Sequence, residues 1–250
     1  MSRFFVSPED IGQDLIIMNN PDDLHHMAKV LRLKEGDEVD ISDGAQWEYR
    51  ARIESAGREE ATLRILDKQA FAAEPSVRVT LFQGIPKAGK METIVQKCVE
   101  LDVHRIVPVF MDRTVVVDRG KFGKKIERWN KVSAEAVKQC RRGIIPEVTD
   151  AVRMEEMLAD QDLFGGFDMV LLAYENEKGT TIKDALQDAC SDAPPQDVAV
   201  FIGPEGGFSG EEAATISARG GVPVSLGKTI LRTETAGMAA LAMIMYELEL

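Results

Sequence analysis

The segment DVAVFIGPEGGFSGEEAATISARGGVPVSLG, residues 197–227, decides the fold of this chain. DVAVFIG at 197–203 is almost wholly apolar and predicts a buried strand, and VPVSLG at 222–227 predicts another. Between them, GEEAATISARG at 210–220 predicts a helix. Apolar strands that alternate with helices are typical of a parallel sheet covered on both faces. The segment therefore predicts an α/β fold.

The same alternation extends outward from this segment in both directions. Toward the C-terminus, residues 233–250 predict a closing helix that is apolar nearly all round. Toward the N-terminus, the pattern predicts strands at 76–84, 104–110 and 167–174 and helices at 90–102, 121–140 and 181–190.

The first 74 residues have a different pattern, that of a small β-rich module. Alternating segments at 38–44 and 48–55 are joined around Asp43-Gly44, which is typical of a hairpin turn. A further strand is predicted at 61–69 and a short helix at 24–33. A polar stretch around Pro75 predicts a boundary between one domain at 1–74 and a second at 75–250.

The composition excludes several classes of protein. The 250 residues are 44% apolar and 29% charged, which is typical of a globular chain and not of a disordered or collagen-like one. The longest nearly apolar run extends from Ala236 to Tyr246. A membrane-spanning helix needs about 20 such residues, so this run is too short. No secretory signal is visible, and three well-separated cysteines predict reduced thiols in the cytoplasm. The three histidines complete no metal-binding pattern, so we expect no metal.

The net charge of −12 is unevenly distributed. Residues 76–145 carry 15 basic and 7 acidic side chains, whereas the segments on either side are strongly acidic. A basic block in an acidic chain predicts a face that binds a polyanion such as RNA, with a solvated helix face as the alternative. The basic residues predicted to bind RNA from this block are Lys87, Lys90, Lys121, Lys124, Lys125, Arg128, Arg141 and Arg142.

Residues 84–90, GIPKAGK, fit most of a nucleotide-binding P-loop between a predicted strand and a predicted helix. The following Met91 has no hydroxyl for Mg²⁺, and Pro86 lacks an N–H where the backbone should hold phosphate. A P-loop nucleotide-binding enzyme therefore stays open as an alternative, and we expect Lys87 and Lys90 to extend the basic face instead.

Three loops follow predicted strands near the C-terminus, at the edge where open parallel sheets bind ligands. Their glycines allow a ligand to approach the backbone, and their apolar side chains suit the faces of an adenine. The structural alternatives are a turn with a Ser209–Glu212 capping box and a surface ion pair between Arg232 and Glu234. The predicted cofactor-binding residues are Leu172, Ala173, Tyr174, Ile202, Gly203, Pro204, Glu205, Gly206, Gly207, Leu226, Gly227, Ile230, Leu231, Arg232, Thr235 and Ala236.

Two of these loops resemble a known family. FIGPEGGFS at 201–209 and LGKTILRTETA at 226–236 are similar to the SPOUT-class RNA methyltransferases, and more narrowly to the ribosomal RNA small subunit methyltransferase E group. The likeness spans most of the chain through RFFV at 3–6, HHMAKVLR at 25–32 and KAGKME at 87–92. Ala88 and Asp102 stand where the family usually has glycine.

The resemblance implies a PUA-like β-barrel at 1–74 and a SPOUT domain with a C-terminal trefoil knot at 75–250. It implies S-adenosylmethionine as cofactor, a homodimer, and methylation of N3 of a uridine in 16S rRNA of the small ribosomal subunit. Arg3, Lys29 and Arg32 lie in the N-terminal motifs and join the residues predicted to bind RNA.

Three residues are predicted to carry the chemistry that the resemblance implies. We expect Arg232 to stabilise the anion that forms when uracil N3 loses its proton. A carboxylate would accept that proton, and Glu234 and Glu205 both stay open for this role. Phe122 and Trp129 could stack on unpaired bases, with core packing as the alternative. The closing helix could lie in the core or in a dimer interface, and a non-catalytic RNA-binding protein stays a further alternative.

Overall fold

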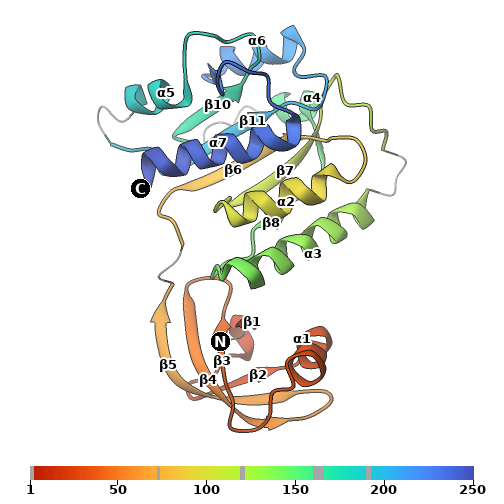
Figure 1. Cartoon of the computed structure of the whole chain (residues 1–250), viewed down its shortest axis with the longest axis vertical. Coiled ribbons are helices and arrows are strands. Elements are labelled where there is room, and N and C mark those ends of the chain that lie inside the picture. The colour runs from red at the N-terminus through yellow and green to blue at the C-terminus, as the bar shows by residue number, and fades with distance from the viewer. Residues whose placement is uncertain (1–2, 72–73, 119–121, 160–165, 190–192) are drawn as a thin grey trace. The chain divides into compact units, whose positions relative to one another are not determined.

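A computed structural model of the chain describes residues 3–71, 74–118, 122–159, 166–189 and 193–250 (Figure 1). By their contacts, the residues form two units. One comprises Met1–Glu74 with Val137–Ile145, and the other comprises Pro75–Ala136 with Pro146–Leu250. The division into an RNA-binding domain at 1–74 and a methyltransferase domain at 75–250 stays a prediction.

The N-terminal unit is built on a five-stranded sheet in the order β1-β3-β4-β5-β2. β1 runs parallel to β3, and the other neighbouring strands are antiparallel. The predicted hairpin joins β3 to β4, where Gly44 has a φ of +69° and the Asp43 carboxylate accepts the amides of residues 45–47. The strands are β1 (Arg3–Phe5), β2 (Leu15–Met18), β3 (Glu38–Ser42), β4 (Trp47–Ala56) and β5 (Ala61–Ala70).

The helix of this unit begins earlier than the predicted residue 24. α1 (Pro21–His25) starts after Asn20, whose side chain accepts the amides of Asp22 and Asp23. Asparagine is a preferred residue at this position because its oxygen satisfies amides that have no partner within the helix. A π-helical turn over His26–Val30 continues it.

The segment Val137–Ile145 lies far along the chain but belongs to the N-terminal unit. The Ser42 hydroxyl donates to the Gly143 carbonyl oxygen at 2.5 Å, and the Arg142 guanidinium pairs with Glu74 at 2.8 Å. Arg3 donates to the carbonyl oxygens of residues 141 and 142 and pairs with Glu48. Both arginines are therefore largely withdrawn from solvent and hold this segment in place.

The C-terminal unit is an α/β fold, as predicted. Its strands form one sheet in the order β12-β10-β11-β6-β7-β8, with β9 also paired to β7, and all pairings are parallel. The strands are β6 (Arg78–Gly84), β7 (Arg105–Phe110), β8 (Glu147–Val148), β9 (Val152–Arg153), β10 (Met169–Ala173), β11 (Asp197–Ile202) and β12 (Val222–Val224).

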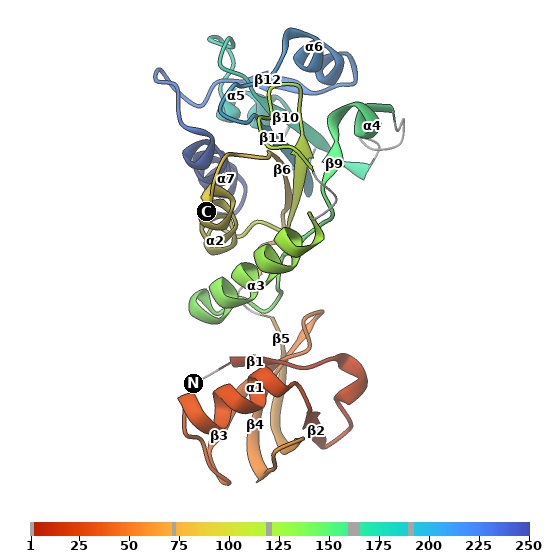
Figure 2. The same ribbon diagram turned by 90° about the vertical axis from the view of Figure 1, so that its right-hand side faces the viewer.

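Helices cover both faces of this sheet. α2 (Lys90–Glu100) and α5 (Ile182–Ala189) pack against α7 (Thr233–Leu248) on one face, and α4 (Met154–Ala159) packs with α6 (Gly210–Ala218) on the other (Figure 2). The long basic helix is α3 (Gly123–Cys140). The sequence pattern did not predict α4, β8 or β9, because elements this short show no clear periodicity.

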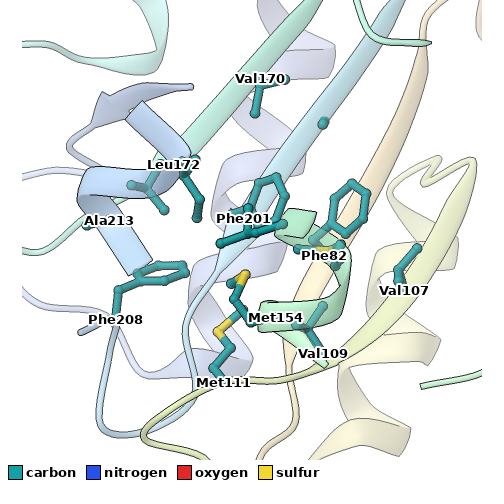
Figure 3. Packing of buried hydrophobic residues seen from close by; sticks show 14 residues of the cluster. Phe82, Val107, Val109, Met111, Met154, Val170, Leu172, Phe201, Phe208 and Ala213 are labelled. Atoms are coloured by element: carbon teal, nitrogen blue, oxygen red, sulfur yellow. The ribbon is translucent and has the colours of Figure 1, made fainter. Parts of the chain in front are cut away.

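A cluster of buried side chains lies between the sheet and the α4–α6 face (Figure 3). Phe82 of β6 and Phe201 of β11 stack with ring centroids 4.4 Å apart. Phe208 and Met111 enter the same cluster from the loops that follow β11 and β7. Phe208 and Met111 therefore anchor these two loops in the core. This anchoring fixes the backbone where the strands of the sheet end.

The closing helix α7 is buried on one side and exposed on another. Gly237 packs over β6 and α2, where a Cβ atom would lie 3.5 Å from Leu81 and 3.7 Å from Cys98. Met243 and Tyr246 are 40% and 70% exposed. Within the described part of the chain, no helix has the length and apolarity that crossing a bilayer requires.

Candidate active site

The three predicted loops lie at one edge of the sheet, because the strands that precede them are all parallel. The loop after β11 and the start of α7 meet directly. Thr233 Oγ1 donates to the Gly203 carbonyl oxygen at 2.7 Å and accepts from Gln83 Nε2 at 2.9 Å. Thr233 and Gln83 are both buried. The structure therefore brings together the second and third predicted loops over the end of β6.

The loop after β11 depends on glycine at two places. A Cβ atom on Gly84 would lie 2.5 Å from the Pro204 nitrogen, so the end of β6 passes directly against this loop. Gly207 has a φ of +68°, which side chains rarely adopt. The capping box of the structural alternative is also present, with reciprocal hydrogen bonds between Ser209 and Glu212. The capping box serves α6, and of residues 203–207 only Glu205 and Gly206 are exposed.

The loop after β10 lies against the other two. The Tyr174 amide donates to the Val224 carbonyl oxygen at 3.0 Å. The Glu175 carboxylate packs against Gly207, where an added Cβ atom would force that carboxylate to shift. Leu172 and Ile202 are buried at the ends of their strands, whereas Ala173 and Tyr174 are half-buried.

The loop after β12 presents both apolar and charged groups. Leu226 and Leu231 are half-buried, Ile230 is 83% exposed, and Gly227 has a φ of +132°. Arg232 is exposed at the position that precedes α7. Its carbonyl oxygen accepts the amides of residues 235 and 236, which fixes the first turn of the helix.

Lys90 links the two carboxylates that were predicted to accept a proton. Its Nζ lies 3.0 Å from Glu205 Oε1 and 3.2 Å from Glu234 Oε2. The Lys87 amide also donates to Glu205 at 3.1 Å. In the P-loop-like segment, the Lys87 amide and the Lys90 ammonium group therefore bind the Glu205 carboxylate. A P-loop would use these groups to bind a phosphate. Among the described residues Glu234 pairs with Lys90, and the surface ion pair with Arg232 that was the structural alternative is not formed.

The surroundings of these carboxylates favour their ionised forms. For Glu205, burial raises the pKa, but hydrogen bonds from its own amide, from Lys90 and from the Lys87 amide together lower it. The backbone amide of Glu234 lowers the pKa of its own carboxyl group, whereas burial raises it. Lys90 and the positive charge of Arg232 lower this pKa further. The Lys90 pKa is raised by its hydrogen bonds to Glu205 and then Glu234. At neutral pH the three groups are therefore all charged.

The residues predicted to bind RNA fall into three groups. Arg3 and Arg142 differ from the prediction, because their guanidinium groups are engaged within the N-terminal unit. Lys90 and Arg128 form ion pairs, Arg128 with Glu92 at 3.1 Å. The third group is exposed and consists of Lys29, Arg32, Lys87, Lys124, Lys125 and Arg141. Lys121 lies outside the described residues.

The two aromatic residues of the basic segment pack in the core. Trp129 and Phe122 are 4% and 9% exposed, with ring centroids 5.5 Å apart. Phe122 also packs on Phe110 of β7. They are therefore core residues and are not available to stack on bases.

Sequence reasoning missed several residues of this site. Gln83 stands at the end of a buried strand, where an isolated polar residue is the signal that could have identified it. Asp112 and Arg113 belong to the loop after β7, which also ends at this edge of the sheet. Arg113 Nη1 donates to the Gly206 carbonyl oxygen at 2.7 Å. Its position after an apolar parallel strand is the same signal that predicted the other loops.

Comparison with known families identifies the chain. A family model described as an RNA methyltransferase domain matches residues 73–245, and an RNA methyltransferase PUA domain model matches residues 19–66. Ribosomal RNA small subunit methyltransferase E of Bacillus subtilis is 30% identical over 100% of this chain and 98% of its own length. This chain belongs to that methyltransferase family. The resemblance predicted from the two loop motifs is confirmed, and the P-loop alternative is not supported.

Solved structures agree with this assignment. The ribosomal RNA small subunit methyltransferase E of Neisseria gonorrhoeae, bound to S-adenosyl methionine, has a TM-score of 0.84 at 27% identity and covers 98% of this methyltransferase and 97% of its own chain. A Legionella pneumophila protein in complex with the bound cofactor SAM has a TM-score of 0.81 at 31% identity, with 98% and 96% of the two chains covered. The shared architecture thus extends over both units of the chain.

Proposed function

We propose that this methyltransferase transfers the methyl group of S-adenosylmethionine to N3 of a uridine in 16S rRNA, either free or in the small ribosomal subunit. The hydrogen bond between Thr233 and Gly203 carries the proposal, because it joins the two loops whose motifs resemble the family. The relatives that bind this cofactor share the fold over nearly the whole chain.

The residues at this edge of the sheet fit such a cofactor. Leu226 and Leu231 offer half-buried apolar surface for an adenine, whereas the α-carbons of Gly203 and Gly206 are covered by Gly207 and Arg113. Lys90, Glu205 and Glu234 together carry one net negative charge, which complements a sulfonium. When bound, S-adenosylmethionine supplies a methyl group that is activated by the positive charge on its sulfur.

The chain's own side chains would prepare the uracil. Arg232 is exposed and would place its guanidinium against the uracil oxygens, where the charge develops as N3 is deprotonated. Glu234 or Glu205 would accept the N3 proton, and both are ionised and therefore able to do so. Holding the acceptor in line with the donor methyl group supplies much of the rate enhancement in reactions of this kind.

Several finer features belong to the proposal. We infer a trefoil knot in the C-terminal unit, a PUA-like barrel in the N-terminal unit, a homodimer and a cytoplasmic location, all from the family likeness. Exposed Lys124 and Lys125 at the start of α3 support a basic RNA-binding face. Lysines that contact phosphates bind RNA of any nucleotide sequence. The choice of the target uridine therefore depends on residues that contact the base.

Mass spectrometry of nucleosides from 16S rRNA, treated with the protein and S-adenosylmethionine, tests this function. We expect 3-methyluridine to appear only when both are present. Calorimetry should detect binding of S-adenosylmethionine or its demethylated product, and ATP should not bind. Absence of 3-methyluridine from both free rRNA and small subunits, with cofactor binding intact, would contradict the proposed substrate. Absence of cofactor binding would contradict the whole proposal.

A further inference from the structure

The loop after β7, residues 111–114, is a fourth loop at the candidate site. Met111 is buried in the core cluster, and the Asp112 amide donates to Glu212 at 2.9 Å. The Asp112 carboxylate accepts from the Ser209 hydroxyl at 2.6 Å. These contacts fasten the loop to the end of the glycine-rich loop that follows β11. Its geometry is therefore set before any ligand binds.

Arg113 is the residue that this loop presents. Its Nη1 donates to the Gly206 carbonyl oxygen at 2.7 Å, and its side chain crosses Gly206 so closely that a Cβ atom there would lie 2.8 Å from Arg113 Cβ. The residue is nevertheless exposed. A guanidinium has five N–H donors, so one can anchor it while others face a ligand.

The charge of Arg113 is not neutralised within the described part of the chain, where none of the ion pairs includes it. The neighbouring carboxylates of Asp112 and Glu212 accept from hydroxyl and amide donors instead. By contrast, Arg78 and Arg128 each pair with a carboxylate. In a chain with a net charge of −12, a fixed and unpaired cation beside the site favours an external anion.

We propose that Arg113 binds a backbone phosphate of the RNA beside the target uridine. A guanidinium matches the paired oxygens of a phosphate in a planar, two-pronged geometry that a lysine cannot provide. The inference rests on the proposed function, because it assumes that RNA approaches this edge of the sheet. Arg113 would then fix the position of the strand, while the adjoining loops hold the cofactor.

Binding of a 16S rRNA fragment at a series of salt concentrations tests the proposal, with the full-length protein and Arg113→Gln. Loss of one phosphate contact should reduce the slope of log affinity against log salt by about 0.7–0.9. Arg105→Gln is the matched control, because it removes the same charge from an exposed position at the opposite end of the same strand, β7. We expect it to preserve the wild-type slope. Arg113→Lys should keep the slope but bind the fragment more weakly than wild type.

Calorimetry with S-adenosylmethionine separates the remaining outcomes. We expect the same cofactor affinity for wild type and Arg113→Gln. A wild-type salt slope in Arg113→Gln would overturn the proposal. So would weaker cofactor binding with an unchanged slope, since Arg113 would then hold Gly206 or the cofactor's own carboxylate. Failure of the wild-type protein to methylate RNA that it binds would count against the proposed function instead, because the salt slopes still decide the role of Arg113.

Discussion

Lys90 Nζ lies 3.0 Å from Glu205 Oε1, so the first residue of α2 is bound to the glycine-rich loop after β11. The same ammonium group lies 3.2 Å from Glu234 in the first turn of α7. One cation therefore joins three segments that are far apart in sequence. It also separates two carboxylates that would otherwise repel each other across the site.

The substitution Lys90→Met should strongly lower the methylation rate and should change the free energy of unfolding only slightly. Without the ammonium group, Glu205 and Glu234 lose their common partner and their fixed positions, and a misplaced group in an active site can cost on the order of 100-fold in rate. Single-turnover methylation of 16S rRNA measures the effect. Lys97→Met is the matched control, because Lys97 lies on the same helix and pairs only with Glu100 among the described residues. Equal activity in the two variants would contradict a role for Lys90 in the site.

The pH dependence of the reaction should move in a defined direction in Lys90→Met. Both carboxylates have pKa values below their usual 4.5, so their favourable interactions are present at neutral pH and are lost as the pH falls through the folded-state pKa. Lys90 contributes to the lowering of both pKa values, although the backbone amide of each glutamate contributes more to its own. Its removal should raise both pKa values and shift the acid limb of the pH–rate profile upward. An unshifted acid limb would show that neither carboxylate titrates in the reaction.

Thr233→Val should weaken both the fold and the binding of S-adenosylmethionine. The hydroxyl group bridges Gly203 and Gln83 in a buried position, and leaving such partners unsatisfied costs about 1–3 kcal/mol. Chemical denaturation and calorimetry measure the two effects. Thr215→Val is the control, since Thr215 is half-buried and its hydroxyl donates to the Glu211 carbonyl oxygen within α6. Wild-type cofactor affinity in Thr233→Val would show that the joined loops do not form the binding site.

Arg232→Ala should reduce turnover by roughly 10²–10³ with cofactor binding largely retained, because it removes a charge that acts on the developing uracil anion. Lys228→Ala removes a cation from the same loop at an exposed position and serves as the control. The measurement is kcat for methylation beside the cofactor Kd. Equal turnover in the two variants would remove Arg232 from the mechanism.

The regular elements of the C-terminal unit were predictable because parallel strands buried on both faces must be apolar. Residues 197–203 and 222–227 carried that signal, and the structure places β11 and β12 within them. The contacts between loops were not predictable. Lys90 was expected on a basic surface but binds Glu205 and Glu234, and Arg142 was expected to face RNA but pairs with Glu74. A charge pattern along the sequence does not specify which carboxylate folds onto which cation.

The exposed apolar side of α7 should mediate the proposed homodimer. Met243 and Tyr246 are 40% and 70% exposed on a helix that otherwise packs against α2 and α5, and exposed large apolar side chains are typical of interfaces. Tyr246→Lys would place a charge in such an interface, where it would be buried without a partner, so we expect a monomeric mass by light scattering at micromolar concentration. Val30→Lys adds a lysine at a 60% exposed apolar position in the N-terminal unit and should leave the mass unchanged. A wild-type protein that is already monomeric would contradict the homodimer, and a dimer that survives Tyr246→Lys would place the interface on another surface.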